Sequence, residues 1–227
     1  MLFISFEGID KSGKTTQTSL LAQYLKERGH RVLKTSEPGG TKLGIKAKEI
    51  LLGPSHPKMS KISELLLYLA DRAEHVEKII KPALAQGKIV ISDRFADATL
   101  AYQGYGRELK MEWIEELNRI VTQDILPDIT FLLDINPSLA RQRGEKKDRM
   151  EQEGQSFHQR VRQGYLELAK SHPERIKIVP GEEPPQSIHL TIREILSPYL
   201  ASGEQKKNSP EKARLKRASI EGSEDVI

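Results

Sequence analysis

Short runs of apolar residues alternate with amphipathic stretches along most of this chain. The runs, such as Leu2–Phe6 and Ile89–Ile91, are nearly continuous, as in parallel strands that are buried on both faces. Between them, apolar side chains recur at the three- and four-residue spacing of a helix. Strands that alternate with helices predict an α/β fold, in which a parallel sheet has helices on both faces. We predict five strands, beginning near Leu2, Arg31, Ile89, Ile129 and Ile176.

Helices are predicted where this spacing has start and stop signals. Ser60 caps a long pattern that ends at Gly87, and we expect Pro82 to kink its last turns. After Arg94, polar and aromatic residues up to Arg107 indicate a loop. Further helices are predicted from Lys14 to the stop signal at Gly29, over Thr41–Leu52 and Met111–Ile125, from Pro137 to Arg143, and over Ser156–Ala169 and Ile188–Leu200.

The composition fits one α/β domain with a substantial core. The 227 residues carry a formal charge of +4, an excess that a phosphate-holding site can use and that does not require a nucleic-acid partner. The chain has no cysteine, which excludes disulfides, thiolate metal sites and a cysteine nucleophile. It shows no signal-peptide pattern and no apolar run near 18 residues, so we expect a cytoplasmic protein without a membrane span.

The composition changes at Ala201, where the chain becomes polar and poor in apolar residues. Such a segment cannot bury enough apolar surface to fold by itself. We therefore predict one domain over residues 1–200 and a disordered tail over residues 201–227. The plain reading of this tail is a solvated extension, and the alternative is an interaction segment.

The segment Gly8–Thr15 matches the phosphate-loop pattern G-x-x-x-x-G-K-[ST], with a predicted strand before it and a helix after it. A loop of this kind wraps backbone N–H groups around phosphate oxygens, and the helix dipole favours the same anion. Lys14 would reach the β- and γ-phosphates, and the Thr15 hydroxyl would bind Mg²⁺. The alternative is an ordinary glycine turn. The predicted nucleotide-binding residues are Gly8, Ile9, Asp10, Lys11, Ser12, Gly13, Lys14, Thr15 and Thr16.

Polar residues follow four of the predicted strands. They are Gly8–Thr15, Glu37–Gly40, Asp93 with Arg94, and Asp134. Ligands of open α/β sheets bind at the carboxyl ends of the strands, so we expect these residues to meet at one edge. Asp93 and Asp134 are both candidates for a Mg²⁺ site, and we favour Asp93 because it adjoins Arg94.

The motifs absent from the chain exclude two classes of phosphate-loop protein. It has no Asn-Lys-x-Asp segment to read guanine and no Leu-Ser-Gly-Gly-Gln signature of transporter ATPases. Its arginines and lysines instead follow strands or gather in one basic segment, as transfer between two phosphorylated molecules requires. A nucleic-acid-binding ATPase that uses the tail is an alternative, although the tail lacks aromatic residues on which bases could stack.

Five segments, in their order and spacing, closely resemble bacterial thymidylate kinases. They are Phe6–Asp10, Glu37–Thr41, Ser92–Phe95, Ala101–Gly104 and Asp148–Glu151. The resemblance covers roughly residues 1–200, most of a typical domain. It implies a P-loop NTPase-type five-stranded parallel sheet with helices on both faces, and a flexible lid over about residues 141–154.

The resemblance implies transfer of the γ-phosphoryl group of ATP to dTMP with Mg²⁺, giving dTDP for dTTP synthesis. It also implies a homodimer that binds neither nucleic acid nor membrane. A deoxynucleoside kinase acting on thymidine itself is the near alternative. No covalent intermediate or strong general base is expected, because the acceptor phosphate is already ionised.

The resemblance also assigns roles to single residues. Arg94 holds the dTMP phosphate, and Asp10 meets the sugar 3′-OH. Thr15 and Asp93 serve the metal, the latter through water. Other expected acceptor-site residues are Glu37, Tyr68, which stacks on thymine, Arg72, which hydrogen-bonds the base, Thr99, Tyr102 and Gln103. The predicted lid residues over ATP are Arg141, Arg143 and Arg149.

Each of these residues can also be interpreted as structural, with no role in substrate binding. Arg94 could pair with a nearby carboxylate, and Arg72 with surface glutamates of its own helix. Tyr68 and Tyr102 could be ordinary packing residues. The lid cations could be a solvated charged run.

The chain departs from the family pattern at three positions. Most bacterial relatives have a small residue where Lys11 stands and keep the catalytic cation in the lid, whereas this chain has both Lys11 and a basic lid. Ser36 replaces a frequent arginine, and Tyr68 replaces the more usual phenylalanine. The candidate catalytic residues are therefore Lys14, Arg94, Lys11, Arg149 and Asp10.

Overall fold

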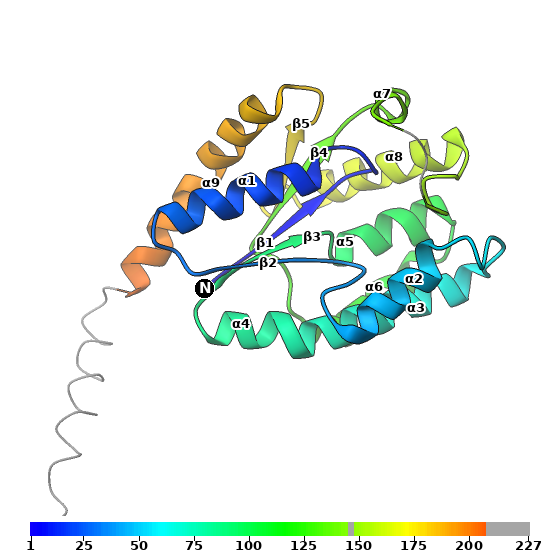
Figure 1. Ribbon diagram of the computed structural model, residues 1–227, viewed down its shortest axis with the longest axis horizontal. Helices are drawn as coiled ribbons and strands as arrows, with labels where there is room; N and C mark the ends of the chain where they lie inside the picture. The colour runs from blue at the N-terminus through cyan, green and yellow to red at the C-terminus, as the bar shows by residue number, and fades with distance from the viewer. Residues whose placement is uncertain (145–147, 208–227) are drawn as a thin grey trace, which may run out of the picture.

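The computed structural model describes residues 1–144 and 148–207. Within them a five-stranded parallel sheet has the order β2-β3-β1-β4-β5. The phosphate loop leaves β1, the central strand (Figure 1). The strands are β1 (Leu2–Glu7), β2 (Val32–Ser36), β3 (Ile89–Asp93), β4 (Ile129–Asp134) and β5 (Ile176–Pro180). This confirms the five predicted strands, the second starting one residue later than expected.

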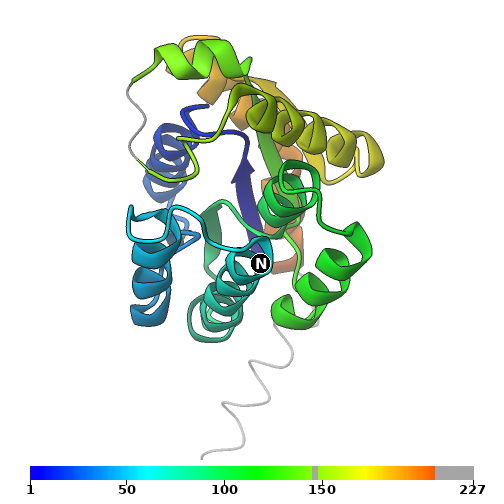
Figure 2. The same cartoon turned by 90° about the vertical axis from the view of Figure 1, so that its right-hand side faces the viewer.

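Helices cover both faces of the sheet, as predicted, and Figure 2 shows β1 in the interior with helices to either side. The helical segments are α1 (Lys14–Glu27), α2 (Lys42–Leu52), α3 (Lys61–His75), η1 (Val76–Ile80), α4 (Lys81–Ala85), α5 (Ala96–Thr99), η2 (Leu100–Gly106), α6 (Met111–Thr122), α7 (Pro137–Gln142), α8 (Gln155–Ser171) and α9 (Pro185–Lys207).

The alternation of side chains along β1 explains the two layers. Ile4 and Phe6 point to one face, where they pack with Leu21 of α1 and Ile192 of α9. Phe3 points to the other face and packs against η1 and α4. Each face is covered by helices, so β1 is fully buried along its length, including the polar residues Ser5 and Glu7 on the face of Phe3.

The long helix after Ser60 is confirmed with one refinement. The Ser60 hydroxyl accepts from the backbone N–H of Ser63, at 3.1 Å, and so caps α3 as expected. A π-helical segment, η1, separates α3 from α4. Pro82 stands in the first turn of α4, where its missing N–H is tolerated. The interruption therefore precedes the proline.

The segment before Arg107 is helical, so its prediction as a loop is wrong. It forms α5 and the π-helical segment η2. At the other end of the chain, α9 continues to Lys207, seven residues beyond the predicted domain boundary. The rest of the predicted tail lies outside the described residues. No helix in the part of the chain that the structure describes is both long and apolar enough to cross a membrane.

Candidate active site

The predicted phosphate loop turns sharply between β1 and α1. Gly8 and Gly13 lie in the left-handed region, with φ of 134° and 101°, and a Cβ atom at Gly8 would stand 2.5 Å from a carbonyl oxygen of β4. Inside the turn, the Lys14 ammonium donates to the carbonyl oxygens of Gly8 and Ile9, at 3.1 and 2.8 Å. Burial and the neighbouring charge of Arg94 lower the pKa of Lys14 to about 8.

A donor cavity opens beside this loop. Among the predicted nucleotide-binding residues, it is lined by Lys11, Ser12, Gly13, Lys14, Thr15, Thr16 and Arg143. The opposite wall is the loop between β5 and α9, from Glu182 to Pro185, together with Ile188. Sequence reasoning missed this wall. The wall follows the carboxyl end of β5. Because ligands of open sheets bind at the carboxyl ends of strands, this position could have identified it.

A second hollow adjoins the loop on the side of α7 and α8. Ile9, Asp10, Lys11 and Arg141 line it, with His158 from α8. Lys11 therefore borders both the donor cavity and this hollow, whereas Arg143 lines only the donor cavity.

The two residues that are predicted to serve the metal, Thr15 and Asp93, are in direct contact. The Thr15 hydroxyl donates to Oδ2 of Asp93 at 2.6 Å. The rival Asp134 is engaged elsewhere, because Arg162 donates to both of its carboxylate oxygens, at 2.7 and 2.8 Å. Among the described residues, no group of three or more His, Asp or Glu side chains is placed to hold a metal. This geometry favours Asp93 over Asp134.

The acceptor pocket brings all eight predicted acceptor-site residues together. Its lining contains Asp10, Glu37, Tyr68, Arg72, Arg94, Thr99, Tyr102 and Gln103. It also contains residues that were not predicted: Pro38, Leu52, Ala98, Asp148 and Met150. Asp148 and Met150 belong to the predicted lid, so this segment forms part of the wall of the pocket.

Arg94 is fixed at the end of β3. It donates to the carbonyl oxygen of Gly8 at 2.8 Å and to the Tyr102 hydroxyl at 3.1 Å. It also forms an ion pair with Asp10, at 2.5 Å, and Tyr102 donates to the other Asp10 oxygen. Burial opposes the charge on Asp10, but Arg94 and Lys14 lower its pKa to about 2. Arg94 therefore pairs with a carboxylate of the phosphate loop and at the same time lines the acceptor pocket, so its predicted role toward a phosphate stays a prediction.

Arg72 is buried, so its reading as a surface partner is wrong. Its Nε donates to Glu37, Nη1 to Thr99 and Asn118, and Nη2 to the carbonyl oxygen of Phe95, at 2.7 to 3.0 Å. A guanidinium has five N–H donors. These contacts occupy four of them, leave one Nη2 hydrogen, and fix the plane of the guanidinium, and Arg72 is one of the residues that line the pocket.

Glu37 contributes indirectly to the pocket. One carboxylate oxygen accepts from Arg72, and the other is 2.8 Å from Nδ1 of His75. Both oxygens are thus engaged by protein groups. Glu37 lines the pocket while it fixes Arg72.

Tyr68 is partly exposed and lines the pocket, which argues against its reading as an ordinary core residue. Burial of its hydroxyl raises the pKa of Tyr68. Gln103 also lines the pocket, and its Nε2 donates to Glu64 at 2.9 Å. The bond holds that amide, so its carbonyl oxygen is the group left for the pocket.

The described part of the lid is tied to the phosphate loop. The Lys11 ammonium donates to the carbonyl oxygen of Gly144 at 2.8 Å and pairs with Glu151 at 3.3 Å. Arg143 donates to the carbonyl oxygens of Lys11 and Gly181, at 3.2 and 2.9 Å. Two cations thus bridge the loop and the lid.

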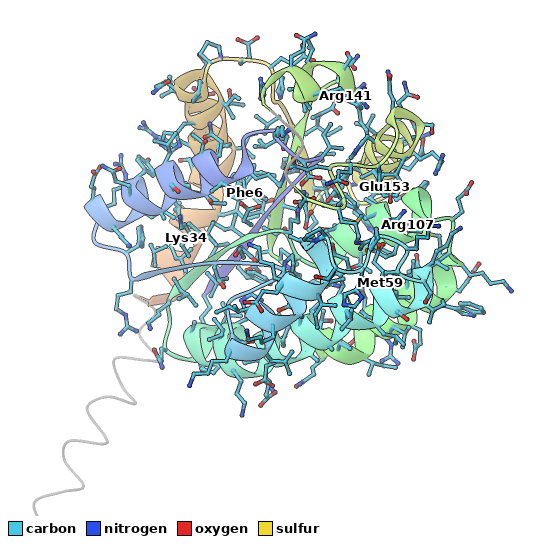
Figure 3. All side chains as sticks on the ribbon, turned by 45° about the vertical axis from the view of Figure 1, so that its right-hand side comes forward. Phe6, Lys34, Met59, Arg107, Arg141 and Glu153 are labelled. Atoms are coloured by element: carbon cyan, nitrogen blue, oxygen red, sulfur yellow. The ribbon has the colours of Figure 1, made fainter. Side chains whose placement is uncertain are left out.

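Arg149 departs from its predicted place over ATP. It is buried beside the acceptor pocket, where it donates to the carbonyl oxygen of Leu51 at 2.8 Å and pairs with Glu64 at 2.6 Å. Arg107 pairs with the same glutamate and with Glu153, and Figure 3 shows Arg107 and Glu153 side by side. Arg149 therefore fastens the lid to α3.

Comparisons with known proteins agree with this geometry. The family model described as thymidylate kinase matches residues 6–192. A thymidylate kinase of Trichormus variabilis is 50% identical over 203 residues, covering 87% of this chain and 96% of the relative. One of Symbiobacterium thermophilum is 44% identical over 201 residues, covering 88% and 94%. The crystal structure of thymidylate kinase from Ehrlichia chaffeensis has 41% identity and a TM-score of 0.72, covering 86% of this chain and 98% of that one. The chain belongs to the thymidylate kinase family.

Proposed function

We propose that this chain is a dTMP kinase, which transfers the γ-phosphoryl group of ATP to dTMP and yields ADP and dTDP for dTTP synthesis. One observation carries the proposal. A single loop, Gly8–Thr15, supplies Lys14 and Thr15 to the donor cavity and Asp10 to the acceptor pocket. The two substrates would therefore meet across this loop, in the arrangement that transfer by positioning requires.

The acceptor base would be read by donors and acceptors that the protein already holds in place. The remaining Nη2 hydrogen of Arg72 suits the O4 acceptor of thymine, and the carbonyl oxygen of Gln103 suits the N3–H donor. Cytosine presents the reverse pattern at these two atoms, so it would leave buried polar groups unpaired. Tyr68 would stack on the base, with Thr99 beside it.

The sugar and phosphate of dTMP would lie nearer the phosphate loop. Asp10 would accept from the 3′-OH, and its low pKa keeps it ionised for this role. Tyr102, whose hydroxyl is fixed by Asp10, would leave little room for a 2′-OH. Arg94 would hold the phosphate through charge-assisted hydrogen bonds.

On the donor side, the loop and Lys14 would hold the phosphates of ATP. Thr15 and Asp93 offer adjacent oxygen ligands, the type that Mg²⁺ takes, so these residues fit the ion. Mg²⁺ would neutralise charge on the donor phosphates when bound. Lys11 and Arg143, which both bridge loop and lid, are the two candidates for the cation that stabilises the transferred group.

The test is a panel of acceptors with purified protein, ATP and Mg²⁺. We expect dTMP to be the preferred deoxynucleoside monophosphate, dCMP to be poor, and thymidine to remain unphosphorylated. Preference for thymidine would support a deoxynucleoside kinase instead. Lys14→Ala, in protein that remains folded, should abolish turnover, and activity retained in that variant would contradict the role of the loop.

The proposal includes a homodimer in the cytoplasm, the compartment that supplies ATP to a kinase. Support for a dimer comes from helices α2, α3 and α6, which lie next to one another (Figure 1). The large apolar side chains that they expose are Leu43, Ile45, Ile50, Ile62, Leu66, Trp113 and Ile120. An apolar surface of this kind is typical of a protein–protein interface.

A further inference from the structure

We propose that Glu7, the last residue of β1, is a positioning residue for Arg94. It holds both the backbone turn that carries this arginine and the tyrosine that touches its guanidinium. This inference rests on the proposed function, in which Arg94 holds the phosphate of the acceptor. Glu7 touches neither substrate and would act through its neighbours.

The backbone at Arg94 needs support. Its φ of 74° lies in the left-handed region, which is unfavourable for a residue with a side chain. The N–H of Arg94 donates to the carbonyl oxygen of Phe6, at 2.9 Å. The next N–H, of Phe95, donates to Oε1 of Glu7 at 2.7 Å. The carbonyl group of Phe6 and the side chain of Glu7 thus fix the turn that directs Arg94 into the pocket.

Glu7 also supports the guanidinium of Arg94, through Tyr165 of α8. The tyrosine hydroxyl donates to Oε2 of Glu7 at 2.7 Å and accepts from Nη1 of Arg94 at 3.3 Å. Each carboxyl oxygen of Glu7 therefore holds one neighbour of Arg94. A change at Glu7 would release the arginine at both its backbone and its side chain.

The charge state of Glu7 suits this task. Its side chain is fully buried, and burial together with Asp97 raises the pKa of Glu7 to about 8, against the opposing effects of Arg94 and Tyr165. Asp97 itself is paired with Arg175. A pKa raised in this way reduces the negative charge that Glu7 places beside Arg94, so Glu7 opposes the binding of a phosphate less than an ordinary carboxylate would.

The chain offers a matched control for simple loss of a buried polar group. Ser5 lies two residues earlier on β1 and is equally buried. Its hydroxyl is 2.7 Å from the hydroxyl of Thr130, and it makes no contact with Arg94 among the hydrogen bonds of the described residues. Ser5→Ala therefore perturbs the same strand without reaching the arginine.

The test compares the affinities for dTMP and thymidine, measured by calorimetry on the full chain. The two ligands differ only in the phosphate, so a role through Arg94 weakens binding of dTMP more than binding of thymidine. We expect Glu7→Ala to weaken dTMP binding about 10-fold and to weaken thymidine binding much less. Glu7→Gln should restore most of the dTMP affinity, Tyr165→Phe should lose several-fold, and Ser5→Ala should lose none.

The outcomes separate this inference from the proposed function. A wild-type protein that does not phosphorylate dTMP contradicts the function itself. An active wild type whose Glu7→Ala variant loses affinity for both ligands equally, or for neither, overturns the inference and leaves Glu7 a structural residue. If Glu7→Ala does not fold, Tyr165→Phe decides the matter by the same comparison.

Discussion

Lys11 of the phosphate loop and Glu151 of the lid form an ion pair, with 3.3 Å between Nζ and Oε2. The same ammonium donates to the carbonyl oxygen of Gly144. Lys11 thus joins the loop to the lid. This position makes Lys11 both a tether and a candidate for the catalytic cation.

We expect Lys11→Gly to lower kcat by about 100-fold, more than Arg143→Ala does. Lys11 borders both hollows beside the loop, whereas Arg143 lines only the donor cavity. A cation that stabilises the transferred phosphoryl group contributes by orders of magnitude. The measurement is kcat at saturating ATP and dTMP. A larger loss in Arg143→Ala would assign the catalytic cation to the lid instead.

Glu64→Gln should loosen the lid over the acceptor pocket. Buried Glu64 pairs with Arg107 and Arg149 and holds the amide of Gln103. Removing its charge leaves two guanidinium groups facing a neutral amide, which should lower the free energy of unfolding by about 3 kcal/mol. The KM for dTMP should rise, because Gln103 and the lid both line the pocket.

Urea denaturation and steady-state kinetics measure these two effects. The control is Glu116→Gln, which removes an exposed pair with Arg119 on α6 and should change neither quantity. A Glu64→Gln variant that matches this control in both measurements would show that the network does not hold the lid.

Asp71 makes stability depend on pH. Burial and the nearby charge of Glu37 raise the pKa of Asp71 from 3.8 to about 7. A carboxyl with a raised folded-state pKa contributes stability that is fully present below about pH 4 and is lost as the pH rises through 7. Asp71→Asn removes this dependence, so its stability relative to the wild type should improve by a few kcal/mol from pH 4 to pH 8.

Urea unfolding at several pH values between 4 and 8 tests this expectation. Asp124→Asn is the control, because Asp124 is an exposed residue at the end of α6. A constant difference between Asp71→Asn and the wild type over this range would contradict the expectation.

Leu66→Glu should convert the proposed dimer into a monomer. Leu66 is 53% exposed on α3 and lies one helical turn from exposed Ile62. A carboxylate buried in an apolar interface carries a large desolvation cost. Leu190→Glu is the matched control, since Leu190 is 52% exposed on α9. Analytical ultracentrifugation distinguishes the two variants, and dimers in both would exclude this surface as the interface.

The strands and the phosphate loop could be predicted because local sequence determines them. A parallel strand buried on both faces is a short apolar run, and Gly8 is required by the close approach of a β4 carbonyl group. The acceptor-site residues were brought together by the family resemblance. Asp10, Glu37 and Arg94 follow the carboxyl ends of strands, in agreement with the rule for open sheets, whereas the other five lie on helical segments.

The segment before Arg107 shows where local signals fail. Its polar and aromatic residues indicated a loop, yet Gly106 is the last residue of the helical segment η2, where an added Cβ would stand 2.7 Å from the ring of Phe157 on α8. The glycine is needed for close packing between two helices and not for a turn. Such a requirement depends on a partner about 50 residues away and leaves no local pattern.

The same limit applies to Arg149. The family resemblance placed it in the lid over ATP, but Glu64, 85 positions earlier, holds it beside α3. Long-range pairing of this kind, like the pairing of Arg162 with Asp134, becomes visible only after the chain has folded.

The shared loop has a thermodynamic consequence. Asp10 lines the acceptor pocket, Lys14 lines the donor cavity, and both interact with Arg94. A nucleotide that shifts the loop on one side must change the free energy of binding on the other. Such coupling is reciprocal, so the factor by which ATP alters the affinity for dTMP equals the factor by which dTMP alters the affinity for ATP. The loop is therefore also the element through which binding of each substrate changes the affinity for the other.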